Sequence, residues 1–129
     1  MDNVFSLCHM EHNLRFIDLK SLEDAKDEIR KIGSDPKSIG IMAPKAISRV
    51  IKLENVVLQD AIIIKQDMLS IGGEVAIPKD AFGLKDETAD ILIIGNVKQL
   101  NDLVGKLDRH YSRIKNISEE LSVLLKEIS

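Results

Sequence analysis

Two lysines in apolar surroundings are the side chains of this sequence best suited to chemistry. Lys65 lies within 56–76 (VVLQDAIIIKQDMLSIGGEVA), and Lys45 lies within 39–47 (IGIMAPKAI). Such a lysine can lay its stem along an apolar surface while its amine reaches water or a carboxylate. Alternatively, burial lowers its pKa, and the amine then grips an anionic group or acts as a base. Both interpretations of Lys65 stay open at this point.

Under the second interpretation, Lys45 and Lys65 hold a phosphate or a carboxylate. Gly95 and Asn96 leave a strand and open a helix, which is where backbone amides attract anions and where ligands of open α/β sheets collect. Asp90, which opens the same strand, is a candidate counter-charge. The predicted ligand-binding residues are therefore Lys45, Lys65, Asp90, Gly95 and Asn96.

Other arrangements of reactive residues are weak. Cys8, His9 and His12 offer three metal ligands within five residues, but zinc sites usually draw four ligands from two separated pairs, and no second pair exists. We therefore predict no metal site and no cofactor. The sequence contains no serine–histidine–acid trio at useful spacing, so catalytic residues are unknown and an enzymatic role stays open.

The segment around Lys65 predicts a helix, a glycine stop and a strand. An apolar stripe follows the helical period, and Lys65 shares it, whereas Asp60 falls on the polar side. Gly72 and Gly73 end the helix, because a left-handed residue is needed there. Asn55 is the expected helix cap. The stripe consists of Leu58, Ala61, Ile62, Ile64, Met68 and Leu69.

The elements on either side predict the fold. Alternating or apolar runs indicate strands at 14–19, 48–54, 74–77 and 90–95, and the last, DILIIG, has the pattern of a strand covered on both faces. Ser21 and Asp35-Pro36 are helix starts, and Asn96 with Gln99 forms a capping box. We predict an α/β (α+β) fold with a single sheet of about four strands, packed helices and a C-terminal helical extension.

Residues 100–128 keep a 3-4 apolar spacing through four heptads. Either two successive helices pack on the parent domain, or one long helix pairs with a second copy of itself. We expect a flexible N-terminal arm at 1–13, an α/β domain at 14–110 and a C-terminal helix at 111–129. A homodimer through that helix is the predicted assembly.

Composition limits the partners. The 129 residues suffice for one domain with one core, and a net charge of −3 with 3% aromatic residues gives no footprint for nucleic acid. No apolar run is long enough to span a membrane. A single cysteine cannot form an internal disulfide, which fits the cytoplasm.

Three segments together resemble the N-terminal extension domain of a subset of dihydropteroate synthases. They are 39–56 (IGIMAPKAISRVIKLENV), 63–77 (IIKQDMLSIGGEVAI) and 89–110 (ADILIIGNVKQLNDLVGKLDRH). Both candidate lysines lie inside these segments. The matching residues are Met42, Pro44, Lys45, Lys52, Leu53, Lys65, Gln66, Met68, Leu69, Gly72, Gly73, Ala76, Asp90, Gly95 and Gln99.

The resemblance implies a stand-alone accessory domain. In those synthases the domain precedes the catalytic barrel that joins a pterin pyrophosphate to p-aminobenzoate, and here a heptad-like helix follows instead. Synthase activity of this chain alone is therefore not expected. We expect a binding or assembly module of folate-like or methanopterin-like pterin biosynthesis, with a separate pterin-pathway enzyme as a candidate partner. The alternative is a small-ligand protein or enzyme in which Lys45 and Lys65 hold an anion.

Overall fold

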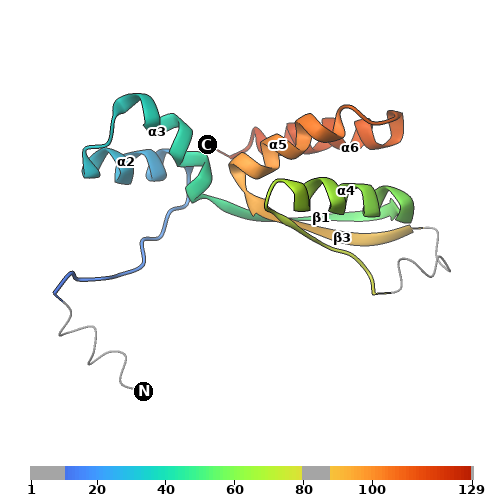
Figure 1. Ribbon diagram of the computed structural model, residues 1–129, viewed down its shortest axis with the longest axis horizontal. Coiled ribbons are helices and arrows are strands. Elements are labelled where there is room, and N and C mark those ends of the chain that lie inside the picture. Colours follow the sequence, from blue (N-terminus) through green and yellow to red (C-terminus); the bar gives the residue numbers. More distant parts are fainter. Residues whose placement is uncertain (1–10, 80–87, 129) are drawn as a thin grey trace, which may run out of the picture.

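The computed structural model describes residues 11–79 and 88–128, and it confirms an α+β fold in which helices pack on one antiparallel sheet (Figure 1). Its strands are β1 (Ser48–Val57), β2 (Glu74–Ala76) and β3 (Thr88–Asn96). Its helices are α2 (Leu22–Ile32), α3 (Pro36–Met42), the 3₁₀ helix η1 (Ala43–Ala46), α4 (Leu58–Ser70), α5 (Val97–Leu107) and α6 (Ser112–Leu125).

The sheet has the order β1-β3-β2, with both pairs antiparallel. In the described part of the chain it has three strands, one fewer than predicted. Residues 14–19, the first expected strand, are extended but pair with no described strand. The alternating pattern gave this segment a strand conformation without giving it a partner.

Helices α4, α5 and α6 lie together on one face of this sheet, as Figure 1 shows. Ile91 and Ile93 of β3 point to the helices and are buried, whereas Ile94 is 38% exposed and its β1 neighbour Val50 is 62% exposed. The expectation that β3 is covered on both faces is therefore wrong. An apolar run in an antiparallel sheet is compatible with one open face, and this run supplies hydrophobic residues to both.

The main core lies between the sheet and these helices. Ala61, Ile64 and Met68 of α4 are buried against β3 and α5. The heptad region forms two helices, α5 and α6, which turn at residues 108–111 and pack on each other, as the first alternative predicts. Ile114 and Leu121 of α6 belong to the same core, so the C-terminal helix is integral to it.

A smaller core joins α2, α3 and η1 to the start of α5 through Ala25, Ala43, Ile47 and Val97. The predicted helix starts are confirmed: the side chain of Ser21 accepts a hydrogen bond from the Asp24 amide, and Asp35 caps α3 ahead of Pro36. In the described ranges no helix is long and apolar enough to cross a bilayer.

Asn55 does not cap α4, contrary to expectation. It lies in a bulge of β1 with φ of 55°, a left-handed conformation that asparagine tolerates. Its amide donates to the carboxylate of Asp90 on β3, at 3.1 Å. The strand continues to Val57, and α4 begins one residue later without a side-chain cap.

The side chain of Met68 packs between Gly73, which precedes β2, and Gly95, which lies near the end of β3. A Cβ at Gly73 or Gly95 would meet the side chain of Met68, at 2.9 Å from Cγ and Sδ in the first case. The predicted glycine stop is confirmed, since Gly72 is left-handed with φ of 92° and ends α4. Gly95 thus has a packing role, because α4 can approach β3 only where no side chain intervenes.

We expect Gly95→Ala to lower the free energy of unfolding by about 1–3 kcal/mol, because it overpacks the Met68 site. The control is Gly105→Ala in α5, where a Cβ meets nothing within 4 Å. That change should raise stability by up to about 1 kcal/mol through helix propensity. Urea unfolding of both variants checks this, and equal behaviour of the two would contradict it.

Candidate functional site: a groove between β1 and α6

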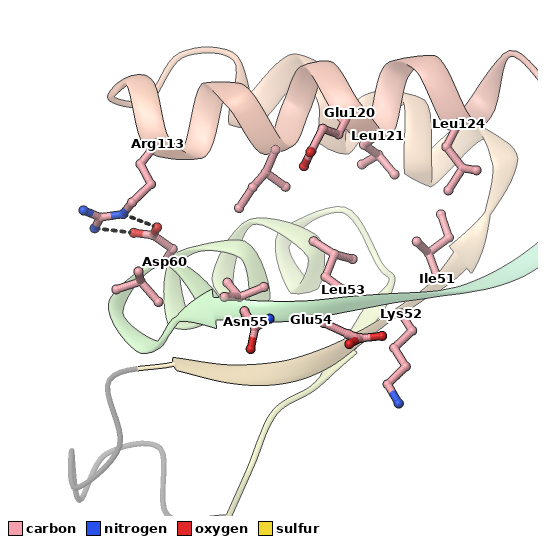
Figure 2. Close-up of a pocket in the computed structure, with 13 residues that line it drawn as sticks. Ile51, Lys52, Leu53, Glu54, Asn55, Asp60, Arg113, Glu120, Leu121 and Leu124 are labelled. Carbon is pink, nitrogen blue, oxygen red and sulfur yellow. Dashed lines mark hydrogen bonds and ion pairs between the residues drawn. The ribbon is translucent and has the colours of Figure 1, made fainter.

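A concave surface runs along β1 beneath α6 (Figure 2). A hollow of about 440 Å³ follows β1 from Ile51 to Val57, and a second, of about 410 Å³, continues along its first residues. Ile51 and Leu124 line both, so they form one channel, here called the β1–α6 groove. Leu53 and Leu121 make much of it apolar.

One end of the groove is closed by a buried carboxylate and its partners. Asp60, in the first turn of α4, is 1% exposed. Arg113 of α6 donates to it through Nε and Nη2, at 2.5 Å and 2.9 Å, and the Tyr111 hydroxyl donates to Oδ1. The guanidinium also lies 5.1 Å from the Tyr111 ring centre. These bonds fix the start of α6 to the start of α4.

The network shifts the pKa of each member in the direction that keeps it intact. Burial alone would raise the pKa of Asp60, but the hydrogen bonds from Arg113 and Tyr111 outweigh it, so the pKa is lowered. The hydrogen bond to Asp60 raises the pKa of Tyr111, and it also raises that of Arg113. Asp60 stays charged and Tyr111 stays a donor at neutral pH.

This network was not predicted from the sequence, in which Asp60 falls on the polar side of its helix. The side chain is buried because α6 folds over it from more than fifty residues away. A signal existed: the single tyrosine of the chain and Arg113 stand at the break between the two heptad helices. His110 at the same break contacts Asp67 of α4, with Nε2 and Oδ2 2.8 Å apart.

Lys65 has the geometry of the first interpretation, in which the stem follows an apolar surface and the amine reaches a carboxylate. Its Nζ donates to the Glu74 carboxylate at 2.9 Å and to the Val75 carbonyl at 2.7 Å, while its stem lies on the apolar face of α4. The side chain is 32% exposed. The hydrogen bond from Lys65 and that from the Val75 amide lower the pKa of Glu74. The lysine therefore ties α4 to the start of β2.

The other predicted site residues are spread over the fold. Lys45 is exposed on η1 and takes part in none of the ion pairs among the described residues. Asp90 lies at the far end of β3 from Gly95 and holds the Asn55 bulge rather than a lysine. Asn96 forms the predicted capping box with Gln99.

The backbone amides at the start of α5 are also in use. The amide of Val97 donates to the Ile47 carbonyl at 2.8 Å, and that of Gln99 donates to the Asn96 side chain at 2.8 Å. The Asn96 amide donates to the Gln99 side chain at 2.9 Å. An anion at this helix start would compete with these internal acceptors. Ligand binding at the predicted residues stays a prediction.

Metal ligands do not gather in the described residues, where no group of three His, Cys, Asp or Glu side chains could hold an ion. Cys8 and His9 lie outside those residues. Every fully buried side-chain nitrogen or oxygen that the structure describes has a hydrogen-bond partner. What the groove offers chemically is an apolar floor and a neutralised ion pair, which suits a hydrophobic or extended polypeptide ligand better than an anion.

Comparison with curated proteins finds two bifunctional enzymes. The chain is 31% identical over 101 residues to the bifunctional dihydropteroate synthase/dihydropteroate reductase of Helicobacter pylori, covering 78% of this chain and 27% of that enzyme. The chain is related to a segment of dihydropteroate synthase proteins. It is also 27% identical over 107 residues to a probable bifunctional folylpolyglutamate synthase/dihydropteroate synthase of Halobacterium salinarum, covering 81% of this chain and 12% of that protein.

These similarities confirm the resemblance inferred from the sequence and connect the chain with folate enzymes. The chain spans about a quarter or less of the length of the curated relatives it matches. No family model matches it. The comparison with solved structures gives no significant match either.

Asp60→Asn removes the charge of the groove carboxylate while keeping its size. We expect the free energy of unfolding at pH 7 to fall by about 1–3 kcal/mol, because three hydrogen bonds to the carboxylate weaken. Since the folded pKa is lowered, this contribution is present above the unfolded pKa of about 3.9 and is lost as the pH falls through the folded value. Urea unfolding from pH 7 to acid should show the two proteins converge.

The control for that series is Asp102→Asn, which breaks the exposed Lys98–Asp102 pair. We expect a change of less than about 0.5 kcal/mol at pH 7. An equal loss in both variants would mean that the buried network contributes no more than an exposed ion pair.

Lys65→Met tests the anion hypothesis. Because Glu74 and the Val75 carbonyl already take up the ammonium of Lys65, we expect millimolar phosphate to leave the Tm of the wild-type protein unchanged. Thermal melting with and without phosphate, in wild type and in Lys65→Met, measures this. A phosphate-dependent rise in Tm that Lys65→Met abolishes would instead support the site.

Proposed function

We propose that this chain is a non-catalytic binding and assembly module for dihydropteroate synthesis, and that it docks on a synthase through the open face of its sheet. Two observations support the docking face. In the relatives, the matching segment is part of a longer chain that is named as a dihydropteroate synthase. Among residues 11–79 and 88–128, helices cover one face of the sheet and none of them covers the other (Figure 1).

The single observation that carries the proposal is the apolar character of that open face. Val50 and Ile94 lie directly opposite each other across β1 and β3, at 62% and 38% exposure. Leu92 and Ala76 continue the row on β3 and β2. Adjacent exposed hydrophobic side chains on a sheet mark an interaction surface when nothing in the chain covers them.

The names of the two relatives share dihydropteroate synthase and differ in the second activity. The chain thus matches part of two proteins that share the synthase name, which favours a role in service of the synthase. Lys65 and Arg113 each pair with a carboxylate of the fold, Glu74 and Asp60. This supports a binding role for the chain rather than catalysis by it. We place the module in the cytoplasm with the pathway.

The proposal predicts that the chain binds the dihydropteroate synthase encoded in the same genome with a Kd in the micromolar range. Val50→Lys puts a charge on the open face and should weaken binding by at least about tenfold, or about 1.4 kcal/mol. Val123→Lys on α6 is the matched control, because Val123 is 64% exposed and lies on another surface. Titration calorimetry with each variant measures this.

Two outcomes would contradict the proposal. If the chain alone forms dihydropteroate from a pterin pyrophosphate and p-aminobenzoate, it is an enzyme. If wild type and Val50→Lys bind the synthase equally, or neither binds, the open face is not the docking surface.

A further inference from the structure

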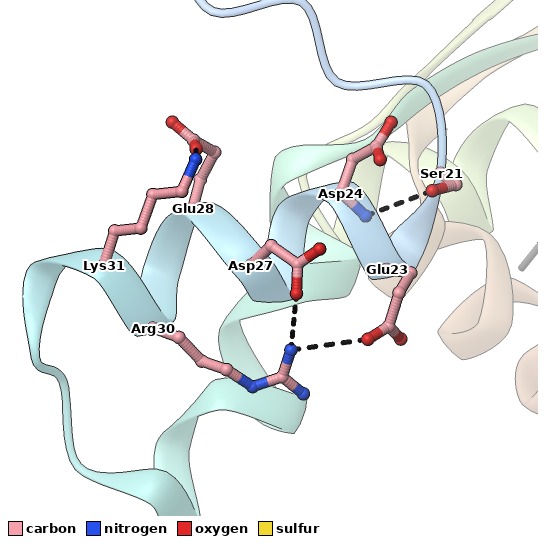
Figure 3. A network of polar contacts seen from close by, with 7 residues as sticks. All are labelled: Ser21, Glu23, Asp24, Asp27, Glu28, Arg30 and Lys31. Carbon is pink, nitrogen blue, oxygen red and sulfur yellow. Dashed lines mark hydrogen bonds and ion pairs between the residues drawn. The ribbon is translucent and has the colours of Figure 1, made fainter.

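Residues 13–20, here called the arm, form an extended stretch with hydrophobic side chains open to solvent. Leu14 is 60% exposed, Ile17 is 48% exposed and Phe16 is fully exposed. The arm ends at Ser21, where the Asp24 amide donates to the Ser21 hydroxyl and fixes the start of α2 (Figure 3). The arm alternates like a strand but has no partner strand in the described structure.

From the start of α2 the arm runs away from the sheet, as its blue ribbon in Figure 1 shows. A hollow of about 810 Å³ lies between the arm and α2, where Glu28 and Ile32 line it. Only the last residue of the arm reaches β1, since the Lys20 carbonyl accepts a hydrogen bond from Arg49 at 3.2 Å and Lys20 lines the second hollow. Residues 14–19 line neither hollow of the β1–α6 groove. The apolar side chains of the arm remain exposed as well.

β1 has a free edge to which an extended segment such as the arm could pair. It pairs only with β3, so the backbone groups of its other edge have no strand partner in the described part of the chain. The β1–α6 groove follows this edge from Ile51 to Val57, a length of seven residues. The six alternating residues 14–19 of the arm, at about 3.3 Å each, span a similar distance.

We propose that the arm of a second copy of this chain adds to the free edge of β1 as an antiparallel strand and fills the β1–α6 groove. Two chains would exchange arms, and each would donate one strand and accept one. Such an interface is self-complementary and closes with two-fold symmetry. Strand addition supplies affinity through main-chain hydrogen bonds and specificity through alternate side chains.

In one register of the arm against β1, both the charged and the hydrophobic residues lie opposite complementary ones. With Asp18 opposite Lys52, the acid meets a lysine that forms no ion pair among the described residues. Ile17 then lies opposite Leu53, whose side chain points into the groove. Charged residues on an edge strand discourage unrelated strands, and a strand of opposite charge is the one they admit.

The same register orients the two ends of the arm. Leu19 falls at Ile51 and Leu124, where the two hollows join, and Arg15 falls near Glu120 at the end that holds Asp60 and its partners. Helix α6 thus forms one wall of the proposed interface. The homodimer expected through the C-terminal helix would use this helix together with the arm. The inference is independent of the proposed link to a synthase.

Mixing two single-cysteine variants tests the exchange. Asp18→Cys and Lys52→Cys chains, both with Cys8→Ser and with tags of different size, are mixed at micromolar concentration and oxidised. We expect a covalent heterodimer, because opposite residues of paired strands lie within disulfide distance. The control pair, Asp18→Cys with Lys31→Cys, should give at least tenfold less, because Lys31 is an exposed residue of α2 outside the groove.

A charge swap tests the register without cross-linking. Light scattering should give twice the chain mass for wild type, the monomer mass for Asp18→Lys, and restored dimer for Asp18→Lys with Lys52→Asp. The arm is outside both cores, so Asp18→Lys should keep the circular dichroism spectrum of the wild type. A monomeric wild type overturns the proposal. So does a mixture of the Asp18→Cys and Lys52→Cys chains that gives no more heterodimer than the control pair.

Discussion

The main constraint on this structure is that its helices cover only one face of the sheet. Met68 of α4 packs where Gly73 and Gly95 leave room, which brings the helix down onto β3. Helices α5 and α6 fill the rest of the covered face. Helices α2, α3 and η1 form a separate small core with the start of α5 instead of covering the other face. The open face and the free β1 edge follow from this arrangement.

The polar contacts act within the same constraint. Arg113 and Tyr111 bring two donors to a carboxylate that would otherwise be buried without partners, which would be costly. Lys65 does the converse, reaching from an apolar helix face to Glu74 and a backbone carbonyl. Each pair links elements that are distant in sequence or differ in type. These ionic groups hold the layers together. Lys65 and Arg113 are therefore both engaged with partners inside the fold.

Local signals in the sequence were sufficient for the elements, and long-range ones were not available for their arrangement. Ser21, Asp35 and Gly72 act on their immediate neighbours, so their roles as caps and stops could be predicted. Asp60 could not be placed, because its partners come from another helix. The role of Asn55 depended on where β1 ends, which is set by pairing with β3.

The same distinction explains residues 14–19. Alternation of apolar and polar side chains specifies an extended conformation with two different faces, but a strand is complete only when an edge receives it. The described part of the chain has one strand-like segment, 14–19, that pairs with no edge, and one edge, on β1, that pairs with no strand. Both are apolar, their lengths correspond, and their charges are opposite at Asp18 and Lys52. Under the proposed arm exchange, the extra strand that the sequence predicted would be supplied to the sheet by another copy of the chain.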